Sequence, residues 1–208
     1  MIQAENLAKE IDEVFTLSPE VFKAISSVKR DVFMPTGLQM HAYKLNALPI
    51  ASSQWISSPL TVAKMSEALE LKGVDSVLEI GCGSGYQAAV LSRVVRRVFT
   101  VERIAKLLNE AKSKFKQLNF NNIHTRLDDG QNGWKSYAPF ERILFSASAT
   151  TIPTKLFEQL KDDGILVAPM VCGSKQIITK FTKRGNKIIK EEFDECAFVP
   201  VLDGIDRT

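Results

Sequence analysis

The sequence has few of the residues that build metal sites or disulfide frameworks. Its 208 residues include three cysteines and two histidines, and no two cysteines form a CxxC pair. Zinc sites and disulfide scaffolds need more of these residues at closer spacing. We therefore expect no metal site, and reduced, widely spaced cysteines of this kind are typical of a cytoplasmic protein.

Long apolar runs and an excess of one charge are also missing. No apolar segment approaches the roughly 18 residues that span a bilayer, and the first residues have neither the basic nor the apolar region of a secretion signal. Lysine and arginine number 27 and aspartate and glutamate 24, a net charge of +3. Without a basic stripe, this balance argues against nucleic-acid binding. We expect a cytoplasmic monomer that binds neither membranes nor nucleic acid.

What the sequence does contain fits one α/β domain over residues 1–208, in two parts. Residues 1–71 predict a helical extension with an irregular stretch. Helices begin at Ser18-Pro19 and Ser58-Pro59, where serine caps the helix and proline takes its first position. Residues 33–58 between them keep no apolar period, and long loops of this kind tend to be functional.

From residue 72 onward, expected strands and helices alternate. This pattern predicts a doubly wound, mostly parallel Rossmann-like sheet. Arg184 to Lys187 resemble a hairpin turn, so the C-terminal edge should be antiparallel. The expected helices are Tyr86–Val94 and Ile104–Leu118. The expected strands are Ser76–Ile80, Arg97–Val101, Ile123–Leu127, Arg142–Ser146, Ile165–Ala168, Gln176–Phe181 and one near Phe193–Val201.

A glycine-rich turn, Glu79-Ile80-Gly81-Cys82-Gly83-Ser84-Gly85-Tyr86, follows the first strand of this region. In a doubly wound sheet, ligands bind at the carboxyl ends of the strands near the topological switch point. Alternating glycines let a ligand approach the main chain closely. The pattern is G-x-G-x-G: Tyr86 stands where a dinucleotide fingerprint has its third glycine, and no Lys-Ser or Lys-Thr follows to form a P-loop.

Two acidic positions should lie at the same edge of the sheet. Glu102 ends the second strand about 20 residues past the loop, where a carboxylate can accept both hydroxyls of a ribose. Asp129-Gly130 ends the third strand, where an acidic side chain could accept the amino hydrogens of an adenine. The alternative for Asp129 is ordinary turn chemistry.

Residues 79–91 are similar to the first motif of class I S-adenosylmethionine-dependent methyltransferases, and more narrowly to that of the protein-L-isoaspartate O-methyltransferase family. The resemblance extends from about Val28 to Leu202. Val28–Pro35 resembles the family's V-P-R-H-x-F-V-P, Tyr43 with Ala47–Ile50 its Y-x-D-x-A-L-P-I, and Gln54–Pro59 its G-Q-T-I-S-x-P. Later matches, in family order, are Asp129-Gly130, Gly133-Trp134, Ala138–Phe140 and Phe198–Leu202.

The resemblance implies an enzyme that uses S-adenosyl-L-methionine to methylate the free carboxylate of L-isoaspartyl residues in damaged proteins. Residues 72–208 would bind the cofactor, and residues 1–71 would lie on the substrate side. The implied catalytic residue is Ser57. The implied cofactor-binding residues are Glu79, Gly81, Cys82, Gly83, Ser84, Gly85, Glu102, Arg103, Asp129 and Gly130. The implied substrate-binding residues are Ile50, Gln54, Trp55, Ile56 and Val199.

The chemistry explains why a serine suits this role. A carboxylate is already ionised at neutral pH, so its attack on a methyl group needs no general base. A hydroxyl can orient it without the strong ion pair by which a lysine would stabilise the ground state. Free N–H groups at the start of the next helix could help, and residues 48–57 could bind the substrate backbone as an extended strand. The alternative is that Ser57 or Ser58 only caps that helix.

Several departures from the family pattern fall on the substrate side. Trp55 replaces a threonine-like residue, Leu45 replaces an aspartate, Glu141 replaces the aspartate of the fourth strand, and residues 147–150 replace A-A-A-P. Two alternatives therefore remain open. One is a methyltransferase for another carboxylate or small molecule, or a cofactor-binding homologue without repair activity. The other is a nicotinamide-dependent oxidoreductase, which Tyr86 disfavours. Cys82 is expected to be a small packing residue.

Overall fold

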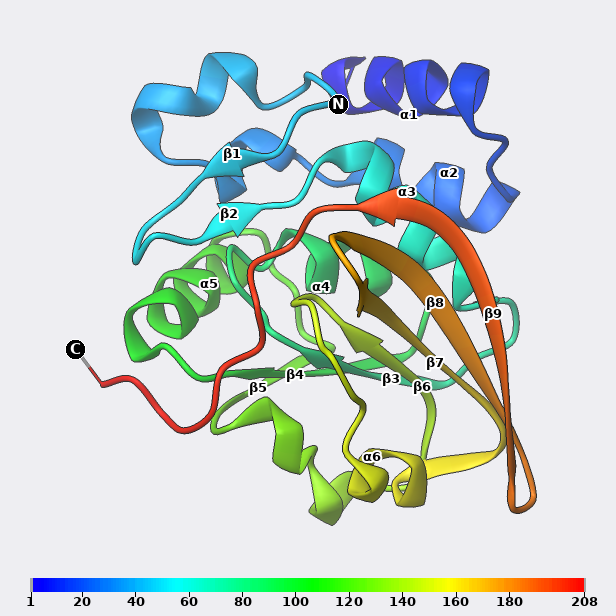
Figure 1. Ribbon diagram of the computed structural model, residues 1–208. Coiled ribbons are helices and arrows are strands. Elements are labelled where there is room, and N and C mark those ends of the chain that lie inside the picture. The colour runs from blue at the N-terminus through cyan, green and yellow to red at the C-terminus, as the bar shows by residue number, and fades with distance from the viewer. Residues whose placement is uncertain (1, 208) are drawn as a thin grey trace.

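The computed structural model describes residues 2–207 and contains one large, mostly parallel sheet (Figure 1). Its order is β5-β4-β3-β6-β7-β8-β9. The first five strands in this order run parallel, and β8 and β9 add an antiparallel edge. The strands are β3 Ser76–Ile80, β4 Arg97–Glu102, β5 Ile123–Leu127, β6 Phe140–Phe145, β7 Leu160–Cys172, β8 Lys175–Arg184 and β9 Lys187–Cys196. This confirms the predicted doubly wound fold, with its switch point between β3 and β6.

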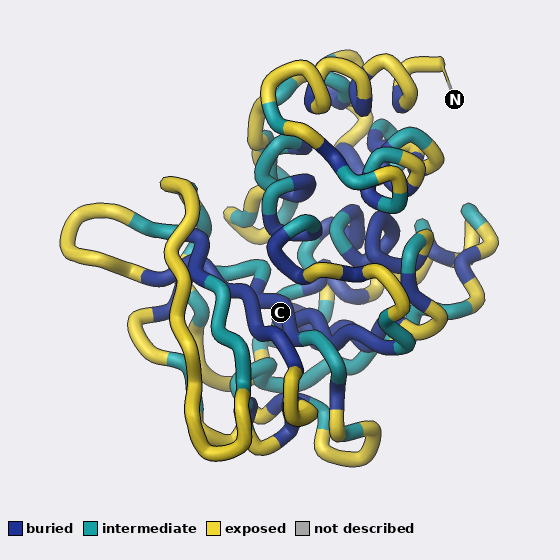
Figure 2. The backbone as a smooth tube through the Cα atoms, turned by 90° about the vertical axis from the view of Figure 1, so that its right-hand side faces the viewer, coloured by how far each residue is buried: buried dark blue, intermediate teal, exposed yellow. Residues whose placement is uncertain are grey.

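Helices cover both faces of the sheet (Figure 1). One face carries α1 Ile2–Val14, α2 Pro19–Ser27, α3 Pro59–Ala68, α4 Tyr86–Leu91 and α5 Ala105–Gln117, and the other carries the short α6 Thr154–Glu158. Successive residues of a strand point to opposite faces, so Val77 joins the core beneath the first group and Leu78 joins the core beneath α6. The central strands are buried, whereas the β8–β9 hairpin is largely exposed (Figure 2).

The predicted helix starts are confirmed in atomic detail. Ser18 Oγ accepts a hydrogen bond from the Val21 N–H, and Ser58 Oγ accepts one from the Thr61 N–H. Proline occupies the first turn of α2 and of α3, where its missing N–H costs no helical hydrogen bond. The cap of α3 is therefore Ser58, which leaves the Ser57 side chain outside the cap.

The irregular stretch before α3 has its own local order. It contains two 3₁₀ helices, η1 Arg30–Phe33 and η2 Thr36–His41, and a small antiparallel hairpin, β1 Leu48–Pro49 with β2 Trp55–Ile56. Two further 3₁₀ helices, η3 Gly130–Asn132 and η4 Lys135–Tyr137, follow β5. Across residues 2–207, no helix combines the length and apolar character needed to cross a membrane.

The prediction for the last strand is wrong. It was expected near Phe193–Val201, but β9 ends at Cys196. The turn pairs Arg184 with Lys187, so the strand begins directly after the turn, and it ends at Cys196, which pairs with Gln176 near the start of β8. The chain then runs across the carboxyl ends of the parallel strands, bridging Pro200 to Ser148 (Figure 1).

Candidate active site

The glycine loop lies between β3 and α4, at the switch point. Gly81, Gly83 and Gly85 all have positive φ, of 93°, 53° and 89°, a region in which side chains are strained. A Cβ added to Gly85 would lie 2.8 Å from Phe115 Cζ. One added to Gly83 would meet no heavy atom of residues 2–207 within 4 Å. Gly85 is therefore needed for packing, whereas Gly83 leaves the main chain open to a ligand.

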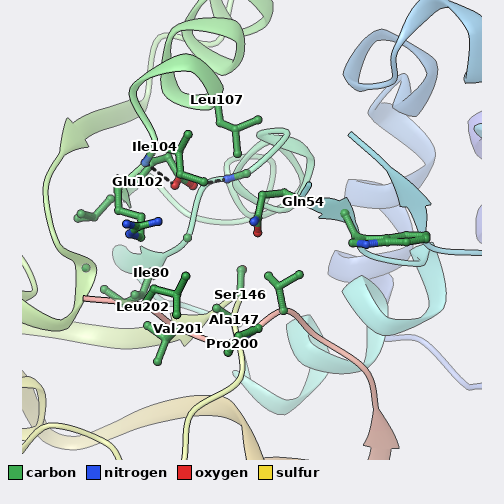
Figure 3. Close-up of a pocket in the computed structure, with 17 residues that line it drawn as sticks. Gln54, Ile80, Glu102, Ile104, Leu107, Ser146, Ala147, Pro200, Val201 and Leu202 are labelled. Carbon is green, nitrogen blue, oxygen red and sulfur yellow. Dashed lines mark hydrogen bonds between the residues drawn. The ribbon is translucent and has the colours of Figure 1, made fainter. Parts of the chain in front are cut away.

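Glu102 connects the loop to the end of β4. One carboxylate oxygen accepts the Gly83 N–H at 2.8 Å, and the other accepts the Ile104 N–H at 2.9 Å (Figure 3). The side chain is thereby fixed in one orientation. Each carboxylate oxygen can accept more than one hydrogen bond, so Glu102 keeps acceptor capacity for ribose hydroxyls.

A central cavity with an empty volume of about 640 Å³ opens beside Glu102 (Figure 3). Its walls come from the carboxyl ends of β3, β4 and β6, from Leu107 of α5 and Gly130 after β5, from the β1–β2 hairpin, and from residues 199–202. Gln54 points into the space between Glu102 and the wall formed by Ser146 and Pro200 (Figure 3). The mixed apolar and polar lining suits a ligand that has both an apolar base and a polar sugar.

Behind the glycine loop lies a second space, here called the loop cavity, with an empty volume of about 340 Å³. Gly81, Gly83 and Ser146 line both this cavity and the central one. Ser57 lines the loop cavity, as does Cys82. The serine of the predicted substrate segment and the predicted cofactor loop therefore meet in one place.

The structure places the predicted cofactor residues in three groups. Those that line the central cavity are Gly81, Gly83, Glu102, Arg103 and Gly130. Those that line the loop cavity are Glu79, Gly81, Cys82, Gly83 and Ser84. Gly85 and Asp129 line neither. The Asp129 carboxylate accepts hydrogen bonds from the N–H groups of Gln131 and Gly204. The first of these is a turn contact of the kind given as the alternative.

Glu79 and Cys82 are buried beneath this loop. The Glu79 carboxyl accepts hydrogen bonds from the Thr100 and Ser146 hydroxyls, and burial raises its pKa to about 8. Burial also raises the pKa of the Cys82 thiol well above its usual range. A thiol held in its protonated form is a poor nucleophile, so the packing role expected for Cys82 fits its surroundings.

Of the predicted substrate residues, Gln54, Trp55 and Val199 line the central cavity. Ile56 lines the loop cavity. Ile50 lies apart, in a hollow between η1 and α5. Trp55 is 54% exposed and borders both the central and the loop cavities.

Arg30 is a site residue that sequence reasoning missed. Its fully buried guanidinium donates hydrogen bonds to the main-chain oxygens of Ala42, Asn46 and Ser57. Burial lowers its pKa, but a guanidinium remains charged in proteins. Within the described residues, Arg30 Nε and the Tyr86 hydroxyl are buried without a hydrogen-bond partner. The sequence signal was the match of Val28–Pro35 to the family's V-P-R-H-x-F-V-P, whose arginine falls at Arg30.

The residues present suit S-adenosylmethionine. Glu102 offers ribose acceptors, Gly83 gives access to the main chain, and Ile80 and Leu107 provide apolar walls for a base. Among residues 2–207, no group of three or more histidine, cysteine, aspartate or glutamate side chains has an arrangement that could hold a metal ion.

A doubly wound sheet with a G-x-G-x-G loop at its switch point and a carboxylate at the end of the next strand is the arrangement of class I methyltransferases. A family model described as protein-L-isoaspartate(D-aspartate) O-methyltransferase matches residues 3–206. The protein-L-isoaspartate O-methyltransferase of Helicobacter pylori strain G27 is 52% identical over 200 residues, covering 96% of each chain. That of Dictyoglomus thermophilum is 43% identical over 184 residues, covering 88% of this chain and 84% of the relative.

Solved structures agree with these sequence comparisons. One described as a protein-L-isoaspartate O-methyltransferase superposes with a TM-score of 0.87 and 25% identity, covering 98% of this chain and 67% of its own. A Plasmodium falciparum protein in complex with S-adenosyl-L-homocysteine shares the fold, with a TM-score of 0.85, 21% identity and coverage of 96% and 98%. The chain belongs to the protein-L-isoaspartate(D-aspartate) O-methyltransferase family, which excludes the oxidoreductase alternative.

Proposed function

We propose that this chain transfers the methyl group of S-adenosylmethionine to the free α-carboxylate of L-isoaspartyl residues in damaged proteins. Family membership supports the reaction and the cofactor. One observation carries the assignment to this site: Ser57 lines the cavity that the glycine loop lines, while Ser58 alone caps α3.

The cofactor would be held by the carboxyl ends of β3 and β4. Glu102 would accept the ribose hydroxyls, and the turn with Gly81 and Gly83 would lie against the amino-acid part. When bound, S-adenosylmethionine supplies an activated methyl group. The chain's own residues have to bring a carboxylate into line with it and keep water away, work that can be worth up to roughly 7–11 kcal/mol in favourable cases.

Ser57 would donate a hydrogen bond to the substrate carboxylate. That bond orients the attacking oxygen and leaves its charge largely intact. Arg30 holds the Ser57 main chain at 2.9 Å, so the hydroxyl starts from a fixed backbone. The β1–β2 hairpin, with Gln54 and Trp55 beside the central cavity, would bind the peptide on either side of the isoaspartate.

We further propose that residues 1–208 act as one cytoplasmic, monomeric methyltransferase domain, with no nucleic-acid or membrane partner. Residues 1–71 would form the substrate side and residues 72–208 the cofactor side. Two observations support this division. The loop cavity is lined by Ser57 from residues 1–71 and by the glycine loop from residues 72–208. The hydrogen bond that holds Ser57, from Arg30, lies within residues 1–71. Cys82, Cys172 and Cys196 are all free, as a reducing compartment requires.

The test uses methyl-labelled S-adenosylmethionine and two peptides that differ only in one L-isoaspartyl or L-aspartyl linkage. We expect base-labile label on the isoaspartyl peptide alone, because a methyl ester hydrolyses in base. Label on neither peptide, with S-adenosylhomocysteine still bound, would remove the substrate assignment and keep the cofactor.

A further inference from the structure

A third hollow, here called the apolar cavity, adjoins the proposed transfer site. It is bordered by Trp55, Ser57 and Ser146 at its inner end and by Ala47, Ala197 and Phe198 further out, with an empty volume of about 770 Å³. Trp55, Ser57 and Ser146 also line the loop cavity. A peptide whose carboxylate reaches Ser57 therefore has this hollow directly beside it.

The walls of this cavity select for apolar groups. None of its lining residues carries a charge, and the Ser57 and Ser146 hydroxyls are its polar side chains. A charged side chain placed against such walls would lose its hydration without gaining a partner. Trp55, with 54% of its surface exposed, offers a large aromatic face at the rim, a type of surface that often anchors bound peptides.

The outer wall is held in place before any substrate arrives. Gln176 on β8 donates to the Phe198 carbonyl and accepts the Phe198 N–H. The Ser148 N–H donates to the Val199 carbonyl. A preformed wall loses little conformational entropy on binding, so contact with it translates into affinity.

We propose that the apolar cavity is a specificity subsite that takes the apolar side chain of a residue directly flanking the isoaspartate, with Trp55 as its main determinant. The proposal rests on the isoaspartyl methyltransferase function given above. The carboxylate itself belongs at the hydroxyl end, next to Ser57, so the apolar part of the hollow is left for a neighbouring side chain. The enzyme thus ranks damaged sites by their sequence context.

The experiment measures kcat/KM on two series of isoaspartyl peptides, one varied at the preceding residue and one at the following residue. Each series carries glycine, leucine or glutamate. We expect leucine to exceed glycine by about tenfold or more at one of the two positions, the range in which apolar pockets discriminate, and glutamate to fall below glycine there. Leucine-to-glycine ratios within twofold of one in both series would overturn the subsite while the methyltransferase function stands. No label on any isoaspartyl peptide would overturn both.

Two substitutions test the residues involved. Trp55→Thr should reduce the leucine-to-glycine ratio towards one, whatever its effect on absolute rates. Phe193→Thr changes an aromatic residue of similar exposure, 50%, that does not border the apolar cavity, and should leave the ratio unchanged. Ala197→Lys adds a cation at the wall and should raise kcat/KM for the glutamate peptide. A ratio that survives Trp55→Thr would overturn the role of Trp55.

Discussion

The cofactor side and the substrate side of this active site are held together by different kinds of contact. On the cofactor side, the Gly81 N–H bonds to the Val101 carbonyl and the Gly83 N–H to Glu102, all within one β-α-β unit. On the substrate side, the buried Arg30 guanidinium gathers three main-chain oxygens of the irregular stretch before α3. Two of the departures from the family pattern, Trp55 and Leu45, also lie on the substrate side. Contacts inside a regular β-α-β unit leave the sequence of the cofactor side little freedom, whereas the sequence of the substrate side can vary around the main-chain atoms that Arg30 holds.

Each side also contains one fully buried ionisable residue, Glu79 under the loop and Arg30 under the hairpin. Glu79 has two hydroxyl partners, and burial raises its pKa towards the neutral form. Arg30 stays charged and uses its charge to hold carbonyl oxygens. Substitutions at these and neighbouring positions can therefore damage one side and spare the other.

The largest effect is expected from Gly85→Val on the cofactor side. The left-handed backbone, with φ of 89°, and the approach to Phe115 together should cost about 4 kcal/mol of unfolding free energy. S-adenosylhomocysteine binding should be lost, because the loop must move. Gly185→Val is the matched control: its φ is 56° in the β8–β9 turn, and strain alone should cost about 1–2 kcal/mol. Urea unfolding and calorimetric binding measure both; equal losses in the two variants would contradict the packing argument.

Arg30→Met should break the substrate side and spare the cofactor side. It leaves the carbonyl oxygens of Ala42, Asn46 and Ser57 without this donor, the first in a buried contact and the others in partly buried ones, which should cost about 3 kcal/mol of unfolding free energy. Methyl transfer should fall further than stability explains, while the Kd of S-adenosylhomocysteine stays within about threefold. Arg142→Met is the control, because Arg142 also donates to three carbonyls, those of Leu69, Glu70 and Glu141, away from the site. A similar loss of transfer in both variants would show that Arg30 does not position Ser57.

Sequence reasoning predicted the cofactor side better than the substrate side, for the same physical reason. Strands 76–80 and 123–127 have the predicted bounds. For the first, a buried and mostly apolar run between turn residues is a local signal. The end of β9 was missed, because Phe198–Val201 form an apolar run that reads like a strand but lines the central and apolar cavities. Arg30 was missed, because its partners at positions 42, 46 and 57 are brought together only by the fold.

Glu79→Gln tests whether the buried carboxyl of the cofactor side is neutral, in contrast to the charged Arg30 of the substrate side. The folded pKa of Glu79 is about 8, raised by burial from 4.5, so the folded state binds the proton more tightly than the unfolded state does. The stability due to this proton is fully present below pH 4.5 and is lost as the pH rises through 8. Relative to the glutamine variant, the wild type should lose about 2 kcal/mol between pH 6 and 8.

Urea unfolding at pH 6, 7 and 8 measures this loss. Glu141→Gln is the control, because the N–H of Asp75 and the Lys161 ammonium lower the pKa of Glu141 despite the effect of its partial burial. Its contribution to stability is lost only in acid, so the wild type and the Glu141→Gln variant should run parallel from pH 6 to 8. A parallel curve for Glu79→Gln as well would show that Glu79 is ionised in the folded protein at neutral pH.

The smallest effect separates two adjacent serines on the substrate side. Ser57→Ala removes one hydrogen bond to an anion, worth about 2 kcal/mol, so kcat/KM for an isoaspartyl peptide should fall about 30-fold with little change in stability. Ser58→Ala should do the reverse: it removes the cap of α3, costs about 1 kcal/mol of stability and keeps transfer close to wild type. S-adenosylhomocysteine affinity should change little in both, because Glu102, the expected ribose acceptor, lines the central cavity and neither serine does. If Ser58→Ala lost transfer and Ser57→Ala kept it, the helix start and not the Ser57 hydroxyl would be what orients the carboxylate.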